Sequence, residues 1–153
     1  MAIIKLGSSK SSTNTINYCE KKAEIKEGLN CNINYAKTQF SITRKLWGKN
    51  DGIQVHTIIQ SFKPNEITPI KANKIGKKLV EEIAKDYEIL IFTHTDKKHI
   101  HNHIVINSVN FNNGKKYHSD KKNLYYIKKR SDEICLENGL SIINSFKSPI
   151  RYT

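Results

Sequence analysis

Arginine, cysteine and proline are scarce in this chain of 153 residues, and it has no long apolar run. Without about 20 consecutive apolar residues, no segment qualifies as a membrane-spanning helix. The start of the chain also lacks the apolar stretch of a signal peptide. The three cysteines, Cys19, Cys31 and Cys135, are widely spaced and form no C-x-x-C pair. This pattern argues against a disulfide framework or a zinc knuckle and predicts reduced thiols in a cytoplasmic protein without membrane insertion.

Acidic residues are few relative to basic ones, since 14 Asp and Glu stand against 26 Lys and Arg and give a formal net charge of +12. Such an excess on a small domain is typical of proteins that bind a polyanion, most often nucleic acid. The only arginines are Arg44, Arg130 and Arg151. Because lysine acts as a point charge on phosphates, the composition favours contact with a nucleic-acid backbone. A lysine-rich composition from an AT-rich genome is the alternative for part of this charge.

Apolar periodicity and turn residues divide the chain into strands and helices. Strands are predicted over residues 3–6, 54–62, 87–93 and 99–109, with a short final strand over residues 140–143. Helices are predicted after a cap at Thr13 or Asn14, over residues 35–46, from Pro69 to Ile83 after the Thr68 cap, and from the Ser119 cap to Asn138 before Gly139. The order β-α-α-β-α-β-β-α predicts one α+β domain over residues 1–153, with an antiparallel central sheet flanked by helices.

Four of the six histidines lie within ten residues, at His94, His99, His101 and His103. Side chains at alternate positions of a strand project from one face, so His99, His101 and His103 are expected to point together. The turn over residues 96–98 would bring His94 beside them. Three neutral imidazoles can bind a metal and leave coordination positions free for water and substrate. The run therefore predicts a catalytic metal site, and a solvated histidine-rich hairpin is the alternative.

A phosphodiester is the natural substrate of a metal site surrounded by positive charge. Asp96 could orient a histidine ring or act as a base. No serine or cysteine has an evident base partner in the sequence, whereas attack by a tyrosine would give a covalent phosphotyrosine. Two of the seven tyrosines stand out. Tyr18 lies close to basic residues near the start of the chain, and Tyr125 lies about one helical turn from Lys128.

Three segments resemble motifs of the N-terminal relaxase domain of plasmid mobilisation nucleases, the MOBP-like branch of the HUH endonuclease superfamily. Ile16-Asn-Tyr18 followed by Lys22 resembles the first motif, and residues 56–62 through Pro64-Asn-Glu66 resemble the central strand and turn. Residues 94–107 resemble the third motif, with the pattern His94-x-Asp96-x-x-His99-x-His101-x-His103-x-x-x-Asn107. Residues 130–140 resemble the closing helix, so the resemblance covers nearly the whole chain.

The resemblance implies site- and strand-specific nicking of single-stranded or locally melted DNA at a plasmid transfer origin, for conjugative mobilisation. Tyr18 would form a 5′-phosphotyrosine, Asp96 or His99 would help to deprotonate it, and accessory mobilisation proteins would be further partners. Mg²⁺ or Mn²⁺ would be bound by His94, His101 and His103. DNA contacts are expected from Lys21, Lys22, Lys97 and Lys98, and support of the site from His56, Glu66 and Asn107. Candidates for stacking on bases are Trp47, Phe62 and Phe111.

Two features depart from the family pattern. Asn102 stands between the paired histidines, where an apolar residue is expected, so His99-Ile-His101 is an alternative pair. Relaxases of this kind are usually longer, and the chain is expected to lack their C-terminal region. Two other functions stay open. One is a rolling-circle replication initiator, whose tyrosine follows the histidine site on a helix as Tyr125 does, and the other is a non-catalytic DNA-binding remnant.

Overall fold

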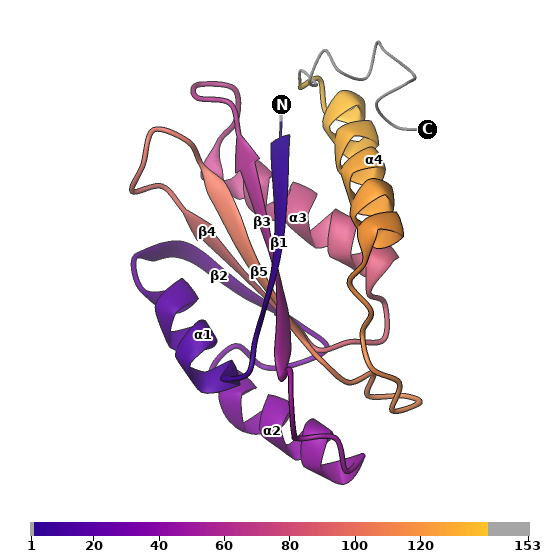
Figure 1. Ribbon diagram of the computed structural model, residues 1–153. Helices are drawn as coiled ribbons and strands as arrows, with labels where there is room; N and C mark the ends of the chain where they lie inside the picture. Colours follow the sequence, from indigo (N-terminus) through magenta and orange to yellow (C-terminus); the bar gives the residue numbers. More distant parts are fainter. Residues whose placement is uncertain (1, 141–153) are drawn as a thin grey trace.

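A computed structural model describes residues 2–140 of the chain (Figure 1). Within this range five strands form one sheet, namely β1 (Ala2–Ser9), β2 (Ala23–Leu29), β3 (Val55–Phe62), β4 (Ile89–His94) and β5 (His101–Asn107). The same range holds four helices, α1 (Ser12–Glu20), α2 (Ala36–Leu46), α3 (Pro69–Ile83) and α4 (Lys121–Glu137). The strand order is β1-β3-β5-β4-β2, and every neighbouring pair is antiparallel. The predicted fold class is therefore confirmed.

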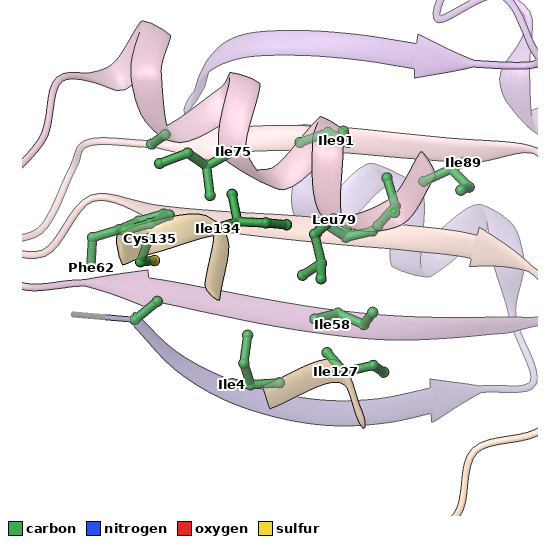
Figure 2. Packing of buried hydrophobic residues seen from close by; sticks show 14 of the residues in the cluster. Ile4, Ile58, Phe62, Ile75, Leu79, Ile89, Ile91, Ile127, Ile134 and Cys135 are labelled. Atoms are coloured by element: carbon green, nitrogen blue, oxygen red, sulfur yellow. The ribbon is translucent and has the colours of Figure 1, made fainter. Parts of the chain in front are cut away.

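The two faces of the sheet carry separate cores, because successive side chains of a strand alternate between faces. The larger core packs the even-numbered residues of β3 and β5, such as Ile58 and Ile104, against α3 and α4. Figure 2 shows Ile58 of β3 in this core with Leu79 of α3 and Ile127 of α4. The smaller core lies on the opposite face, under α1 and α2, and is formed by Ile16, Cys19, Ala36, Phe40, Val55, Leu90, Phe92 and Val105. The sheet therefore separates α3 and α4 from α1 and α2.

Helix α3 forms as the sequence predicts. The side chain of Thr68 accepts a hydrogen bond from the backbone N–H of Lys71, and Pro69 occupies the first turn, where its missing N–H costs nothing. Gly139 adopts a φ of +76° after α4, in the left-handed region that glycine tolerates. The caps of α1 and α4 are Ser11 and Asp120 rather than the predicted residues, because these neighbours hold the extended backbone that a cap requires.

Strand β2 corrects the predicted element order, which had no strand between the first two helices. It pairs with β4 at the edge of the sheet, after Lys22 turns the chain with a φ of +63°. Charged residues at alternate positions, Glu24 and Lys26, are exposed, as is usual on an edge strand. The sequence Ala-Glu-Ile-Lys-Glu-Gly-Leu has few β-branched residues, so its strand character comes from pairing with β4 rather than from propensity.

The predicted strand over residues 140–143 falls almost entirely outside the described range, which ends at Leu140. Among residues 2–140, no helix has both the length and the apolar character needed to cross a bilayer. The second histidine-bearing strand, β5, begins at His101 rather than at His99. His99 therefore belongs to the loop between β4 and β5, which changes its relation to the other histidines.

Candidate metal centre and active site

A cavity of about 300 Å³ opens where β4 ends and β5 begins. Its walls come from α1, β3, β4, β5 and the loop between β4 and β5. The side chains that line it are those of Tyr18, Ile59, Ser61, His94, Asp96, Lys97, His99, His101 and His103. Antiparallel pairing of His94 with His101 accounts for this convergence, because directly opposed residues project from the same face of a sheet. The cavity thus gathers the predicted nucleophile, the predicted ligands and the predicted bases.

Three histidines form a tight cluster on the α1 side of the sheet. One ring nitrogen from each of His94, His101 and His103 lies within 4.8 Å of the other two. The ring centroids are 4.5 Å apart for His94 and His103, 4.9 Å for His101 and His103, and 5.1 Å for His94 and His101. Because metal–imidazole bonds are about 2.1 Å long, the nitrogens are close to the spacing that one cation requires.

Hydrogen bonds fix the direction of two of these rings. Nε2 of His94 donates to the carbonyl oxygen of Cys19 at 2.6 Å, and Nδ1 of His101 donates to that of His99 at 3.1 Å. Since a carbonyl can only accept, Nδ1 of His94 and Nε2 of His101 keep their lone pairs. Nδ1 of His103 lies 3.8 Å from Sγ of Cys19. Metal-binding histidines are commonly held in this way by the ring nitrogen that does not bind the metal.

Burial favours the neutral, metal-binding form of two of these imidazoles, those of His103 and His101. Burial, together with the neighbouring imidazoles of His94 and His101, lowers the pKa of His103 to about 4. Burial also lowers the pKa of His101. Near neutral pH these two rings are therefore uncharged and do not lose their lone pairs to protons. The two neutral rings and the ring of His94, held by its hydrogen bond to Cys19, together offer three nitrogen donors to a divalent metal ion.

Tyr18 is exposed at the mouth of the cavity. Its neighbours along α1, Ile16 and Cys19, are buried in the smaller core, whereas the Tyr18 side chain is 74% exposed. Its ring centroid lies 6.5 Å from that of His103, with the planes at 77°. The helix is fixed at its other end by Gln54, whose Oε1 accepts from the backbone N–H of Ser12 at 2.9 Å. A large aromatic residue is thus presented beside the histidines on an anchored helix.

The loop between β4 and β5 places its residues differently from the simple alternation of a strand. His99 is exposed and lines the cavity, but its Nδ1 donates to the carbonyl oxygen of Phe62 at 3.3 Å. It is not a member of the cluster formed by His94, His101 and His103. Asp96 and Lys97 line the cavity, and Lys98 is exposed in the same loop. Lys21 and Lys22 are exposed at the end of α1.

The predicted supporting residues lie away from this cavity. His56 projects from the opposite face, where its ring packs 4.9 Å from that of Tyr117. Glu66 lies in the loop before α3 and lines a different cavity. Asn107 ends β5, where its Oδ1 accepts from Arg44 at 3.1 Å and its Nδ2 donates to Glu88 at 3.0 Å. The hydrogen bonds of Asn107 lie at the opposite end of β5 from His101, so they do not reach the histidine cluster.

Tyr125 also lies on the other side of the sheet. It belongs to α4, whose buried residues pack in the larger core, and the sheet stands between this helix and the three histidines. Phe62, a candidate for stacking, is buried in the same core with 1% of its surface exposed. The geometry thus brings Tyr18, and not Tyr125, to the cavity.

A buried polar network behind the histidines was not predicted. Asn102 projects opposite to His101 and His103, and its Nδ2 donates to Oε1 of Gln60 at 3.0 Å and to the carbonyl oxygen of Ala72 at 2.8 Å. Its Oδ1 accepts from Oγ1 of Thr93 at 2.7 Å. Asn73 and Ser131 extend the network into α3 and α4. The only signal in the sequence was an amide at a position expected to be apolar and buried.

An antiparallel α+β domain with a three-histidine centre and an adjacent tyrosine defines a nuclease-like class of protein. The chain belongs to the MobA/VirD2-like relaxase nuclease domain family, whose model matches residues 14–140. The predicted resemblance to relaxases is thereby confirmed.

Known relatives are similar over different shares of their length. Protein rlx of Staphylococcus aureus is 54% identical over all 153 residues, which cover 49% of that protein. The group II intron-interrupted relaxase LtrB of Lactococcus lactis subsp. cremoris (strain MG1363) is 36% identical over 124 residues, covering 69% of this chain and 22% of LtrB. The chain therefore spans about half the length of the staphylococcal relatives.

A solved structure shares the fold. It is described as "Molecular Basis of Vancomycin Resistance Transfer in Staphylococcus aureus" and aligns with a TM-score of 0.67, over 93% of this chain and 96% of that chain. The sequence identity is 13%, so the likeness establishes a common architecture and nothing about individual residues.

Proposed function

We propose that residues 1–153 act as a single DNA-nicking domain that cleaves one strand at a plasmid transfer origin, in a metal-dependent and sequence-specific reaction. One observation carries this proposal, namely that Tyr18 and the three-histidine cluster line the same cavity. Membership of the relaxase nuclease family supports the reaction class. The net charge of +12 supports a polyanionic substrate.

The phenol oxygen of Tyr18 would attack the scissile phosphorus. A bond forms between this oxygen and phosphorus, the bond to the 3′ oxygen breaks, and the DNA 5′ end remains attached to Tyr18. The phenol proton passes to Asp96 or His99, both of which line the cavity, and the leaving 3′ oxygen takes a proton from solvent. The phosphotyrosine conserves the bond energy for later rejoining of the strand.

His94, His101 and His103 are the residues that would hold a divalent cation, because one ring nitrogen of each lies within 4.8 Å of the other two. When bound, the ion would neutralise charge on the non-bridging phosphate oxygens. Of the two predicted ions, Mn²⁺ suits a set of three imidazoles better than Mg²⁺, which prefers oxygen ligands.

Exposed lysines in the loop between β4 and β5 and directly after α1 would contact the DNA backbone. Lys97 lines the cavity, and Lys98 is the next residue in the chain. Lys21 and Lys22 directly follow the last residue of α1. A cavity of about 300 Å³ admits a phosphate with its sugar but not a base-paired helix. The substrate is therefore single-stranded or locally melted DNA, in which unpaired nucleotides can enter.

Covalent trapping tests the proposal. Wild-type protein, Tyr18→Phe and Tyr125→Phe would each be incubated with single-stranded oligonucleotides that span candidate transfer origins, with Mn²⁺ or with EDTA, and analysed on denaturing gels. We expect an SDS-resistant adduct with wild type and Tyr125→Phe in Mn²⁺, and none with Tyr18→Phe. An adduct lost only in Tyr125→Phe would instead support a replication-initiator mechanism. DNA binding without any adduct would favour a non-catalytic module.

A further inference from the structure

A second, smaller cavity lies beside the histidine cavity on the same face of the sheet. Its volume is about 210 Å³, and its lining residues are Ile3, Lys5, Ser61, Phe62, Lys63, Pro64 and His99. Ser61 and His99 line both cavities, so the two are contiguous. His99 forms part of the wall between them, with its Nδ1 fixed to the carbonyl oxygen of Phe62.

Strand register explains how the two cavities are aligned. Ile3 pairs with Ser61, Ser61 pairs with His101, and His101 pairs with His94, which makes one row of side chains across four strands. Since neighbouring strands are about 4.8 Å apart, Ile3 lies about 10 Å from His101 along this row. A phosphate at the histidines and an adjoining nucleoside at Ile3 would therefore lie along one line across β4, β5, β3 and β1, whose order can be followed in Figure 1.

The chemistry of the smaller cavity differs from that of the larger one. Ile3 is 45% exposed, although it is a large apolar residue, and the half-buried Pro64 lines the same cavity. Lys5 and Lys63 are exposed at its rim, and none of its lining residues is acidic. An apolar floor with cationic edges and one imidazole wall suits a flat heterocycle attached to a phosphodiester.

We propose that this cavity is a nucleoside subsite that takes the base of a nucleotide adjoining the scissile phosphate. The base packs against Ile3, Pro64 and the His99 ring, while Lys5 and Lys63 contact the flanking phosphates. This inference rests on the proposed function, because it assumes that single-stranded DNA occupies the histidine cavity. In this subsite His99 contacts the DNA base and does not bind the metal.

The test compares DNA with and without bases. Fluorescein-labelled 12-nucleotide single strands of mixed sequence and fully abasic strands of the same length would be titrated, in EDTA, by fluorescence anisotropy. The variants are Ile3→Ala and a matched control, Ile70→Ala, which changes an exposed isoleucine of α3 on the other side of the sheet. EDTA prevents metal-dependent cleavage, so binding is measured separately from nicking.

We expect Ile3→Ala to weaken binding of the base-containing strand about fivefold to tenfold, as expected for loss of part of one base contact. Binding of the abasic strand should not change, and Ile70→Ala should match wild type with both strands. A Lys63→Ala variant should weaken both strands equally and lower the salt slope by about 0.7. Thermal melts would check that Ile3→Ala is folded.

Two results would overturn the subsite in distinguishable ways. If Ile3→Ala and Ile70→Ala bind the base-containing strand with the same affinity as wild type, the subsite is wrong and the proposed nicking function is unaffected. If wild type binds neither strand and forms no adduct at Tyr18 with Mn²⁺, the proposed function itself is wrong and the subsite falls with it.

Discussion

The carbonyl oxygen of Cys19 accepts a hydrogen bond of 2.6 Å from Nε2 of His94, joining the last turn of α1 to the end of β4. Tyr18 directly precedes Cys19. The proposed nucleophile and a proposed metal ligand therefore meet in one contact between residues 75 positions apart. Any displacement of the His94 ring would be transmitted to the backbone beside Tyr18.

Replacing His94 with alanine should loosen the end of α1 as well as remove a ligand. Loss of one buried hydrogen bond, worth about 1 kcal/mol, should raise local opening about fivefold. Hydrogen–deuterium exchange of the backbone amides in residues 19–22 would measure it. His101→Ala is the matched control, because the hydrogen bond of His101 goes to His99 in the loop directly before β5 and not to α1. Equal exchange in the two variants would count against the coupling.

Metal binding should depend on the clustered histidines and not on His56. In the double variant His101→Ala, His103→Ala, we expect Mn²⁺ affinity measured by calorimetry to fall at least about a hundredfold, with the circular dichroism spectrum unchanged. His56→Ala should bind Mn²⁺ like wild type, since His56 lies on the opposite face. Unaltered affinity in the double variant would refute the metal site.

The network around Asn102 should contribute strongly to stability. Asn102→Leu removes the partners of Gln60 and Thr93 in a fully buried environment, and should lower the free energy of unfolding by about 2–4 kcal/mol. Urea titration measures this loss. Asn14→Leu changes an exposed asparagine of α1 and should shift stability by no more than about 0.5 kcal/mol. Similar midpoints for both variants would mean that the network adds little.

The buried carboxyl of Asp132 should make stability fall as pH rises. Burial raises its pKa from 3.8 to about 7. Between pH 4 and pH 7 the folded state therefore retains a proton that the unfolded state has released, and stability declines across this window. The total is on the order of a few kcal/mol. Asp132→Asn should flatten the dependence in melts at pH 5 and pH 8, whereas exposed Asp51→Asn should retain it.

Local rules predicted much of the site. Thr68 and Pro69 define the start of α3 through capping chemistry alone, and the alternation of a strand correctly placed His101 and His103 on one face. The same rule failed for His99, because β5 begins two residues later and a loop has no period of two. Where a strand begins depends on its neighbours, which a sequence does not display.

Long-range contacts account for what could not be predicted. Asn107 matched a family pattern, yet its partners are Arg44 and Glu88, at the far end of β5. Strand β2 is recognised only once β4 is present to pair with it. The partners of Asn102 come from β3, β4 and α3. The sequence can therefore indicate that Asn102 needs hydrogen-bond partners, but it does not show which residues they are.

The order in which the parts of the cavity occur along the chain has a consequence for synthesis. Tyr18 is made early, whereas His94, His101 and His103 follow more than 70 residues later and lie within a single hairpin. A nascent chain therefore exposes the proposed nucleophile well before any of the three clustered histidines has been made. The proposed active site is assembled only when the hairpin of β4 and β5 has emerged from the ribosome and α1 has docked on it.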